Sequence, residues 1–358
     1  MSKCLPLVTI VTATYNLEKN NRFQCMEKCI HSVAMQDYPN IEHLIIDGAS
    51  TDGTLKFLNK YKNKLVIYSE KDKGLYDAFN KGIKKAKGKY IAFLGSDDLY
   101  AGNDVIFKMV NKLEENHADW VYGDTYYVTD KQIILWKGKI SYLIFGSSPC
   151  HQSTMFSVKA LKDIGLIKDD IISGDTLSMI ALMANGYKSC YVEEPLSIFN
   201  VGGASSNVDL LNEDYINSFV KHFYEIVKDK LPLTIEDCRN LYMGKCYETL
   251  TTEELVSLAN KLKYSEWVQS LFNKDIVVFT KLLYEKGDIS NCCLPVTKNK
   301  ESYKLFSFLP IMKIKKHAGR TTYQLFGFLP IFKIRKMSNG ITTTYYILNI
   351  PVMKVSRK

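Results

Sequence analysis

Two adjacent carboxylates, Asp97 and Asp98, lie just past the end of a short apolar run at residues 89–94, after Gly95 and Ser96. A run of this length, bounded by glycines, is typical of a buried strand in a parallel sheet. Ligands of open α/β sheets bind at the carboxyl ends of the strands, so chemistry is expected at this point. Neighbouring carboxylates repel each other unless a proton or a cation separates them, and Mg²⁺ shared with substrate phosphates would do so. Alternatively, either aspartate could cap the segment that follows.

The elements that would position this pair alternate between strand and helix. Apolar runs and helical periodicity predict strands at residues 7–12, 41–47 and 65–68, and helices at residues 23–36 and 54–61. This order predicts an α/β fold with a doubly wound, mostly parallel sheet.

Three further polar blocks lie where these predicted elements meet. The first ends the strand at residues 7–12, the second ends the strand at residues 41–47, and the third has the order Asp-x-Gly-x-x-Asp-Ala-x-Asn-x-Gly within residues 70–82. The candidate ligand-binding residues in these blocks are Thr14, Tyr15, Asn16, Asp47, Lys73, Gly74 and Asp77. The third block is too specific in its order to be only a solvated helix start.

Taken with residues 96–98, the order and spacing of these blocks resemble the family 2 glycosyltransferases over residues 1–207. The resemblance implies a GT-A fold, a nucleotide-sugar donor such as a UDP-sugar, a divalent Mn²⁺ or Mg²⁺ ion, and transfer with inversion at the anomeric carbon. By position, it implies that Thr14 and Asp47 contact the nucleoside and that Asp77 lies near the base and ribose. It places Asp97 near the ribose and diphosphate, and makes Asp98 the metal ligand.

The chain departs from the family pattern at two glycines. Many members have an acidic pair where this chain has Asp47 and Gly48. The metal motif often starts with an aspartate, and here that position is Gly95. Nucleoside recognition is therefore expected to depend on Asp47, and metal binding on Asp98 with the diphosphate.

The acceptor side of the reaction is predicted around Asp175, which precedes an apolar helix. Inverting transfer requires a base for the acceptor hydroxyl, and a carboxylate often fills that role. The resembling family has its catalytic aspartate at this point, although residues 176–177 differ from the usual pattern. Asp175 could instead only cap the helix. His151 and Gln152 would line the acceptor pocket by the same resemblance, or be structural, and residues 199–206 would form a mobile lid or an ordinary turn.

The rest of the composition indicates a reduced, cytoplasmic protein. The nine cysteines include no Cys-x-x-Cys pair. Met1 is followed almost directly by the first strand, so no signal peptide is expected. No run of eighteen apolar residues predicts a transmembrane helix.

Residues 208–295 change to a helical pattern, with helices predicted at residues 215–227, 238–250, 253–262 and 275–284. We expect a small bundle that packs on the catalytic domain or holds a partner.

Residues 296–358 are repetitive and basic. A Tyr-x-Leu-Phe-x-Phe-Leu-Pro-Ile pattern recurs, with degenerate spacing in its last copy, around Pro310, Pro330 and Pro351. This segment holds 13 Lys and Arg against one acid, whereas the rest of the chain holds 34 basic and 37 acidic residues. Basic residues interleaved with apolar ones suit an anionic membrane surface. The alternative is a β-hairpin addition whose apolar residues pack inside, and nucleic-acid binding is not expected because aliphatic residues predominate.

The sequence therefore predicts a metal-dependent, inverting glycosyltransferase of surface polysaccharide biosynthesis, capsule or lipopolysaccharide, peripheral on the cytoplasmic face of the cell membrane. Its acceptor would be a glycan or a lipid-linked glycan. One rival is a nucleotidyltransferase, which should carry a glycine-rich phosphate loop after the first strand; residues 14–17 do not provide one. The other is a non-catalytic glycan-binding or scaffold protein on a decayed transferase fold, against which the retained Asp97, Asp98 and Asp175 argue.

Overall fold

The structure, a computed structural model, describes residues 5–129, 132–146, 148–202, 212–242, 250–262, 265–266 and 268, and five strands between residues 312 and 356. The backbone forms two compact units, residues 1–238 and residues 239–358. The predicted helix at residues 275–284 and most of the predicted lid lie outside the described residues.

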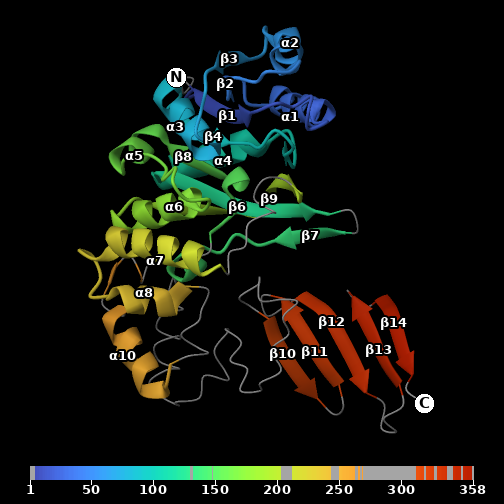
Figure 1. The fold of residues 1–358 in the computed structure, drawn as a ribbon, viewed down its shortest axis with the longest axis vertical. Helices are drawn as coiled ribbons and strands as arrows, with labels where there is room; N and C mark the ends of the chain where they lie inside the picture. The colour runs from blue at the N-terminus through green and yellow to red at the C-terminus, as the bar shows by residue number, and fades with distance from the viewer. Residues whose placement is uncertain are drawn as a thin grey trace. The chain divides into compact units, whose positions relative to one another are not determined.

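The first unit begins with the predicted alternation of strands and helices (Figure 1). Strands β1 (Val8–Thr14), β2 (Ile41–Asp47), β3 (Val66–Ser69) and β4 (Tyr90–Phe93) run parallel in the order β3-β2-β1-β4. Between them lie α1 (Phe23–Ala34), α2 (Thr54–Leu58) with the 3-10 helix η1 (Asn59–Tyr61), and α3 (Leu75–Lys85). The predicted α/β class is confirmed.

The sheet continues beyond β4 with a change of direction. Strand β8 (Thr154–Ser157) lies antiparallel between β4 and β6 (Trp120–Val128). Strand β9 (Ser189–Asn200) then runs parallel to β6, and β5 (Leu99–Tyr100) and β7 (Ile133–Trp136) pair antiparallel with β9 and β6. As a result, the segment that starts with His151 enters the sheet beside the carboxyl end of β4, and Asp97 and Asp98 follow that end.

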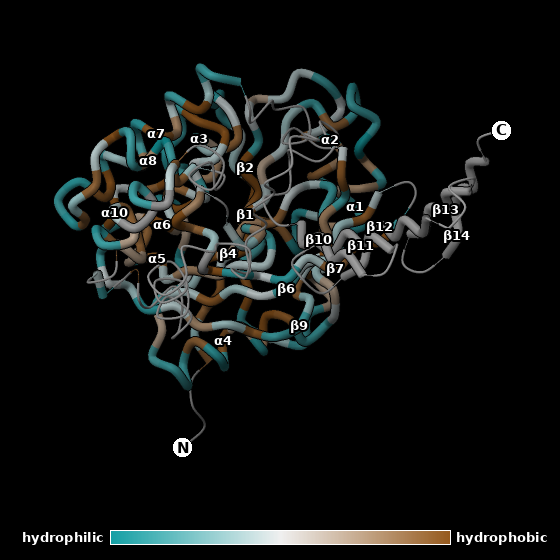
Figure 2. Tube along the Cα trace, turned by 90° about the horizontal axis from the view of Figure 1, so that it is seen from below, coloured by the Kyte–Doolittle hydropathy of each residue, from teal (hydrophilic) through white to brown (hydrophobic). Residues whose placement is uncertain are grey.

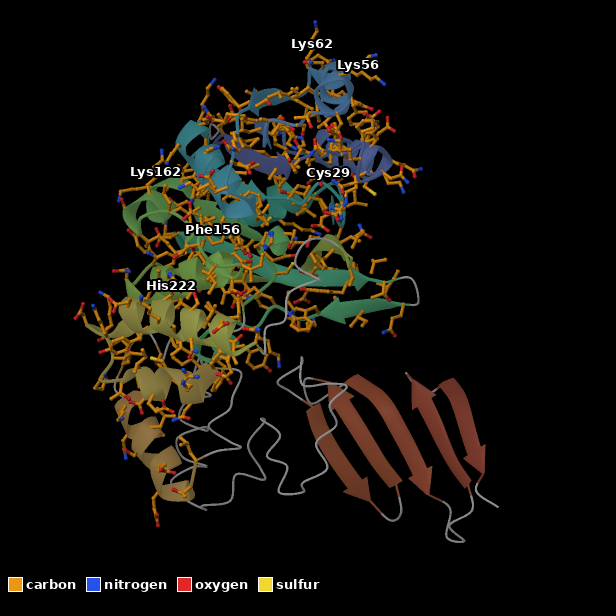
Figure 3. All side chains as sticks on the ribbon, viewed as in Figure 1. Cys29, Lys56, Lys62, Phe156, Lys162 and His222 are labelled. Carbon is orange, nitrogen blue, oxygen red and sulfur yellow. The ribbon has the colours of Figure 1, made fainter. Side chains whose placement is uncertain are left out.

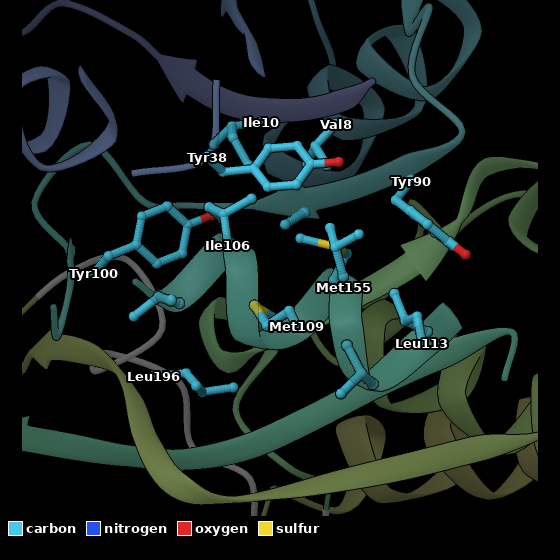
Figure 4. Packing of buried hydrophobic residues seen from close by; sticks show 14 of the residues in the cluster. Val8, Ile10, Tyr38, Tyr90, Tyr100, Ile106, Met109, Leu113, Met155 and Leu196 are labelled. Atoms are coloured by element: carbon cyan, nitrogen blue, oxygen red, sulfur yellow. The ribbon is translucent and has the colours of Figure 1, made fainter. Parts of the chain in front are cut away.

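Helices cover both faces of this sheet. The main apolar cluster joins one face of β1 and β4 to α1 and α4 (Val105–Asn116), and Figure 4 shows Met109 of α4 near Met155 of β8. Helix α3 covers the opposite face, where an added Cβ at Gly82 would lie 2.6 Å from Cγ1 of Val11. In Figure 2 the hydrophobic stretches gather along β1 and β2. Such burial on both faces is what fixes the strand ends rigidly.

Further helices complete the first unit near Asp175. The 3-10 helices η2 (Ile140–Phe145) and η3 (His151–Ser153) precede β8, and α5 (Val158–Asp163), α6 (Gly174–Ala184) and α7 (Glu213–Val227) follow. Helix α7 is joined to the loop before α6 by His222, labelled in Figure 3, whose Nε2 lies 3.1 Å from Oδ2 of Asp170. The Ser173 and Tyr215 hydroxyls are also hydrogen-bonded. Helix α7 therefore holds the segment that leads into Asp175.

In the C-terminal part of the chain, two helices match the predicted helical pattern. Helix α8 (Ile235–Leu241) starts earlier than expected from residues 238–250, of which 243–249 lie outside the described residues. Helix α10 (Thr252–Leu262) agrees with the prediction at residues 253–262.

The repeats form a five-stranded antiparallel sheet in sequence order. Its strands are β10 (Met312–His317), β11 (Arg320–Leu325), β12 (Leu329–Lys336), β13 (Thr342–Ile347) and β14 (Ile350–Ser356). The register shifts just after Pro330 in the β11–β12 pair and just after Pro351 in the β13–β14 pair. Proline lacks the N–H that a regular ladder needs, so it suits a bulge at this point. Each of these two repeats is thus one strand pair with the same irregularity.

The register also separates charge from apolar residues across this sheet. Because neighbours in register share a face and residues alternate along a strand, one face carries the basic positions Lys313, Lys315, Arg320, Lys333, Arg335 and Lys354. The other face carries Met312, Ile314, Tyr323, Phe332, Ile334, Tyr345, Met353 and Val355, with Lys316 and Lys336 towards one end.

Candidate active site

The polar residues predicted from the sequence meet at the carboxyl ends of the parallel strands. Thr14, Asp47 and Ser69 are the last residues of β1, β2 and β3 and lie in register. Asp97 and Asp98 follow β4 at the same edge of the sheet. This is the edge where open α/β sheets bind their ligands.

Asp47 is completely buried and accepts hydrogen bonds from three residues. Its Oδ1 accepts from Oγ1 of Thr14 at 3.1 Å and from Oγ of Ser50 at 2.6 Å. Its Oδ2 accepts from the Ser50 N–H at 2.9 Å and from Oγ of Ser69 at 2.7 Å. The predicted residues Thr14 and Asp47 are therefore in contact. Asp47 also connects the ends of β1, β2 and β3.

A carboxylate that the sequence analysis missed lies beside Gly48. An added Cβ at Gly48 would be 2.6 Å from Oδ2 of Asp72 and 3.2 Å from Cδ2 of Tyr15. Asp72 therefore fills the space in which the second acid of the family pattern would stand. Burial raises the pKa of Asp72. The Tyr15 side chain is 59% exposed and offers a flat surface beside this carboxylate. The signal for Asp72 was its place in the charged block at residues 70–82.

Asn16 connects the loops that follow β1 and β2. Its N–H donates to Oγ of Ser50 at 2.8 Å, and its Oδ1 accepts from the Thr51 N–H at 3.0 Å. Its backbone is left-handed, with φ 46°, a conformation that asparagine tolerates better than most residues. Asn16 is nearly buried, so it shapes this rim of the site.

Lys73, Gly74 and Asp77 form the start of α3. Gly74 has a φ of 134°, which favours glycine, and the Lys73 N–H donates to Oδ2 of Asp77 at 3.0 Å. Burial would raise the pKa of Asp77, but this bond and the ammonium of Lys81, 3.4 Å away, lower it. Asp77 is thus an ionised group that fixes the turn before α3.

The acidic pair after β4 is held by residues from three distant segments. Nη1 of Arg22 lies 3.1 Å from Oδ2 of Asp97. Nε2 of Gln152 donates to Oδ2 of Asp98 at 2.8 Å, and the N–H of Asn200 donates to Oδ1 of Asp98 at 3.0 Å. Burial and the adjacent charge of Asp97 raise the pKa of Asp98 to about 6. Arg22 was not predicted, because it carries no recognisable local pattern. Asn200 lies in the segment predicted as a lid or turn, residues 199–206, but its contact with Asp98 was not predicted.

These carboxylates fit a hard divalent cation. Each ionised carboxylate oxygen keeps a second lone pair after accepting one hydrogen bond, and a cation would relieve the repulsion between Asp97 and Asp98. Within the described ranges, no cluster of three or more His, Cys, Asp or Glu residues could hold a metal by itself. An ion here would therefore have to complete its coordination with ligand oxygens and water, as Mg²⁺ commonly does.

Asp175 lies in the first turn of α6 and contacts three donors. Nδ1 of His151 is 2.8 Å from its Oδ2. Its Oδ1 accepts from the Tyr76 hydroxyl at 2.9 Å and from the Thr176 N–H at 2.8 Å. Burial would raise the pKa of Asp175, but His151 and the other donors bring it below its ordinary value. The predicted residues Asp175 and His151 are thus in direct contact.

A small pocket lies against the His151–Asp175 pair. Its other lining side chains are mostly apolar: Phe79, Phe93, Phe156, Leu161, Ile167 and Ser178. The predicted acceptor-side residues therefore divide between two tasks, since His151 contacts Asp175 while Gln152 contacts Asp98.

The arrangement of the first unit is that of the GT-A fold. Among solved structures, TarS of S. aureus in complex with UDP-GlcNAc aligns with a TM-score of 0.52 at 17% identity, over 89% of this chain and 97% of that one. The mannosyltransferase PcManGT from Pyrobaculum calidifontis, in complex with GDP-Man and Mn²⁺, aligns with a TM-score of 0.51 at 17% identity, over 78% and 85%.

Residues 9–170 match the family model for glycosyl transferase family 2. Over this segment the chain is similar to glycosyl transferase family 2. It is 30% identical over 158 residues to a PGL/p-HBAD biosynthesis glycosyltransferase of Mycobacterium bovis, covering 42% of this chain and 59% of that protein. It is 39% identical over 103 residues to the putative teichuronic acid biosynthesis glycosyltransferase TuaG of Bacillus subtilis, covering 27% and 38%. The chain thus spans less than two thirds of these relatives.

Proposed function

We propose that this protein transfers a sugar from a nucleotide-sugar, most simply a UDP-sugar, to a hydroxyl group of a glycan or lipid-linked acceptor, with inversion. One observation supports this most directly: two consecutive residues, His151 and Gln152, bind the two acidic centres of the site, Asp175 and Asp98. Inversion requires a base on the side of the sugar opposite the leaving diphosphate. The dipeptide connects Asp175, which we assign to the base, with Asp98, which we assign to the diphosphate and its metal ion.

On the donor side, we assign the nucleoside to the edge formed by Thr14, Tyr15, Asp47 and Asp72. The diphosphate would lie at Asp97 and Asp98 with a divalent ion, Mn²⁺ or Mg²⁺, held by Asp98. Such an ion supplies positive charge to the departing diphosphate. The complexes of the structural neighbours with UDP-GlcNAc, and with GDP-Man and Mn²⁺, support this assignment.

On the acceptor side, the Asp175–His151 pair would take the proton of the attacking hydroxyl. Phe79 and Phe156 line the small pocket beside this pair, and by our proposal these apolar side chains limit water there and so favour transfer to the acceptor over hydrolysis. Residues 1–207 would be the catalytic domain, residues 208–295 a helical region, and residues 296–358 a surface-binding or packing module.

We propose surface polysaccharide synthesis at the cytoplasmic face of the membrane as the setting. The similarity to glycosyltransferases named for PGL/p-HBAD biosynthesis and, putatively, for teichuronic acid biosynthesis supports this setting. In the part of the chain that the structure describes, no helix is long and apolar enough to cross a membrane. The basic face of the β10–β14 sheet suits anionic lipid headgroups, to which each Lys or Arg contributes roughly 1 kcal/mol of attraction.

A panel of ligands tests the proposal. UDP-glucose, UDP-galactose, UDP-GlcNAc and GDP-mannose would each be added with and without Mn²⁺, and the shift in unfolding temperature measured. A donor at one hundred times its dissociation constant stabilises the folded state by about 2.7 kcal/mol. We expect one donor to stabilise the protein only with metal, and then to release nucleoside diphosphate when acceptors are supplied. Stabilisation by a nucleoside triphosphate and not by any nucleotide-sugar would favour the nucleotidyltransferase, and no stabilisation at all would favour the scaffold.

A further inference from the structure

Three aromatic side chains lie close together where β6, β7 and β9 run side by side. The ring centroid of Tyr127 on β6 is 5.3 Å from that of Trp136 on β7 and 4.9 Å from that of Phe199 on β9. Tyr127 pairs with Phe199 in register, and Trp136 pairs with Thr125, two residues before Tyr127 on the same strand. Because neighbours in register share a face and residues alternate along a strand, the three rings occupy one face of the sheet. We call Tyr127, Trp136 and Phe199 the aromatic row.

The aromatic row adjoins the acidic pair of the candidate site. Strand β5 begins with the residue after Asp98 and pairs antiparallel with β9. Continuing this register brings Asp98 beside Phe199, and the N–H of Asn200 donates to Oδ1 of Asp98 at 3.0 Å. The Tyr127 hydroxyl bonds with the thiol of Cys150 in the segment before β8. The row therefore starts at the carboxylate that we assign to the metal and extends away from it across β9 and β6 to β7.

Within the row, Tyr127 supports the other two rings. Its hydroxyl end is buried, which raises its pKa, and its ring has Trp136 on one side and Phe199 on the other. All three residues are half-buried. In the described part of the sheet, β7 pairs with β6 alone, so Trp136 lies at an outer edge. Trp136 and Phe199 are thus the rings best placed to contact a ligand.

The chemistry of the row suits a sugar ring. The face of an aromatic ring is electron-rich, and a pyranose presents polarised C–H groups on its flat side and hydroxyl groups around its rim. Polar groups border the row at Asp98 and at the Gln152 amide, which donates to Oδ2 of Asp98 at 2.8 Å. Sugar hydroxyls can hydrogen-bond with such groups, whereas an aliphatic chain would only remove water from them at a cost in free energy.

We propose that the aromatic row is an acceptor subsite, in which a pyranose ring of the acceptor glycan stacks on Trp136 and Phe199. This inference rests on the proposed function and specifies its acceptor. The stacked ring is the unit next to the one that receives the new sugar, because the row starts at Asp98 and leads away from it. The acceptor is then a glycan of at least two sugar units, and not a single sugar or a bare lipid.

Fluorine NMR of the full chain labelled with fluorotryptophan tests this subsite without turnover. The chain has three tryptophans, and the spectrum of Trp136→Phe identifies the Trp136 resonance. Maltose, cellobiose, lactose and diacetylchitobiose would each be titrated at millimolar concentration, with dodecyl phosphate as the lipid probe. We expect at least one disaccharide to shift the Trp136 resonance saturably while the resonance of the fully buried Trp120 stays in place.

Steady-state kinetics test the same subsite during transfer. With the donor found in the ligand panel, Trp136→Ala should raise the acceptor KM about tenfold, as expected for the loss of one good aromatic contact. The donor KM, and any hydrolysis of the donor without acceptor, should be unchanged because two strands separate Trp136 from Asp98. Trp136→Phe keeps a ring and should retain most of the acceptor affinity. Phe107→Ala is the matched control, because Phe107 is an aromatic side chain on α4 that is 41% exposed.

Two results would overturn the inference. One is a Trp136→Ala variant that transfers sugar with an acceptor KM within about twofold of the wild type, in which case the proposed function stands and the subsite does not. The other is a Trp136 resonance that no disaccharide moves, and movement with dodecyl phosphate alone would make the row a lipid contact. If the wild type uses no nucleotide-sugar, the proposed function fails, and the disaccharide titration still decides whether the row binds sugars.

Discussion

Gln152 and Asp98, 54 residues apart, are joined by a hydrogen bond of 2.8 Å that fixes the carboxylate after β4 to the segment before β8. The antiparallel entry of β8 beside β4 makes this contact possible. The segment before β8 therefore cannot shift without moving Asp98, so the proposed metal site and the proposed acceptor side share one rigid support.

Replacing Asp98 with Asn should stabilise the metal-free protein while removing its response to Mn²⁺. The pKa of Asp98 rises from 3.8 to about 6 on folding. Ionising this group in the folded state thus costs roughly 3 kcal/mol above pH 6, and the cost disappears as the pH falls towards 4. Urea unfolding in EDTA at pH 7.5 and pH 4.5 would measure the difference. Equal gains at both pH values would contradict this explanation.

Replacing Arg22 with Gln should weaken binding of UDP by about tenfold while leaving uridine binding unchanged. The guanidinium pairs with Asp97, and without it the diphosphate meets two carboxylates with less positive charge nearby. Calorimetry with UDP and uridine at fixed Mn²⁺ measures both affinities. Lys89→Gln is the control, because it breaks the Lys89–Glu114 pair elsewhere on the protein. Equal losses for UDP and uridine would indicate a distorted fold.

Asp72 should be required for nucleoside binding, because its carboxylate fills the space that a side chain at position 48 would occupy. Asp72→Ala should weaken UDP binding about tenfold, within the range for a charge-assisted hydrogen bond. Gly48→Asp alone should destabilise the protein, because its Cβ would lie 2.6 Å from Oδ2 of Asp72. The double variant should recover part of the affinity measured by calorimetry. If it binds no better than Asp72→Ala, the two positions do not supply the same group.

Gly174→Ala should lower stability by about 1–3 kcal/mol, the usual range for forced overpacking, and reduce turnover. Its Cβ would clash with the carbonyl oxygen of Lys168, so the first turn of α6, which carries Asp175, would have to move. Thermal unfolding and steady-state rates would detect both effects. Gly102→Ala is the control, since its nearest contact would be the end of the Asp104 side chain at 3.2 Å.

Reversing charge on the basic face of the repeat sheet should release the protein from anionic vesicles. Lys313, Lys333 and Lys354 occupy equivalent positions in the three repeats and share that face by register. Their triple replacement by Glu should reduce sedimentation with vesicles rich in phosphatidylserine, and added salt should reduce it for the wild type. The matched control is Lys316→Glu with Lys336→Glu on the opposite face. Equal losses in both proteins would mean that the face is not the binding surface.

The sequence predicted the parallel half of the fold and the acidic strand ends well, because apolar periodicity is local and Asp47, Asp97 and Asp98 each follow a recognisable strand. It did not predict that β8 would enter antiparallel, because a strand of four residues, Thr154–Ser157, does not specify which strand it pairs with. Arg22 and Asp72 were missed for a related reason. Arg22 contacts Asp97, and Asp72 lies beside Gly48. Both partners are distant in the sequence, so the residues next to Arg22 and Asp72 in the chain do not indicate these contacts.

The two complete strand pairs of the repeat sheet have the same bulge, and this affects how the number of repeats can change during evolution. Each copy carries its own irregularity at the same place, so loss or duplication of one 20- or 21-residue unit would leave the pairing inside every other copy unaltered. The first unit has no such freedom, because its strand order interleaves distant segments. Tandem recombination could thus lengthen or shorten the repeat sheet as a graded adjustment of positive charge, while the first unit and its candidate site stayed constant.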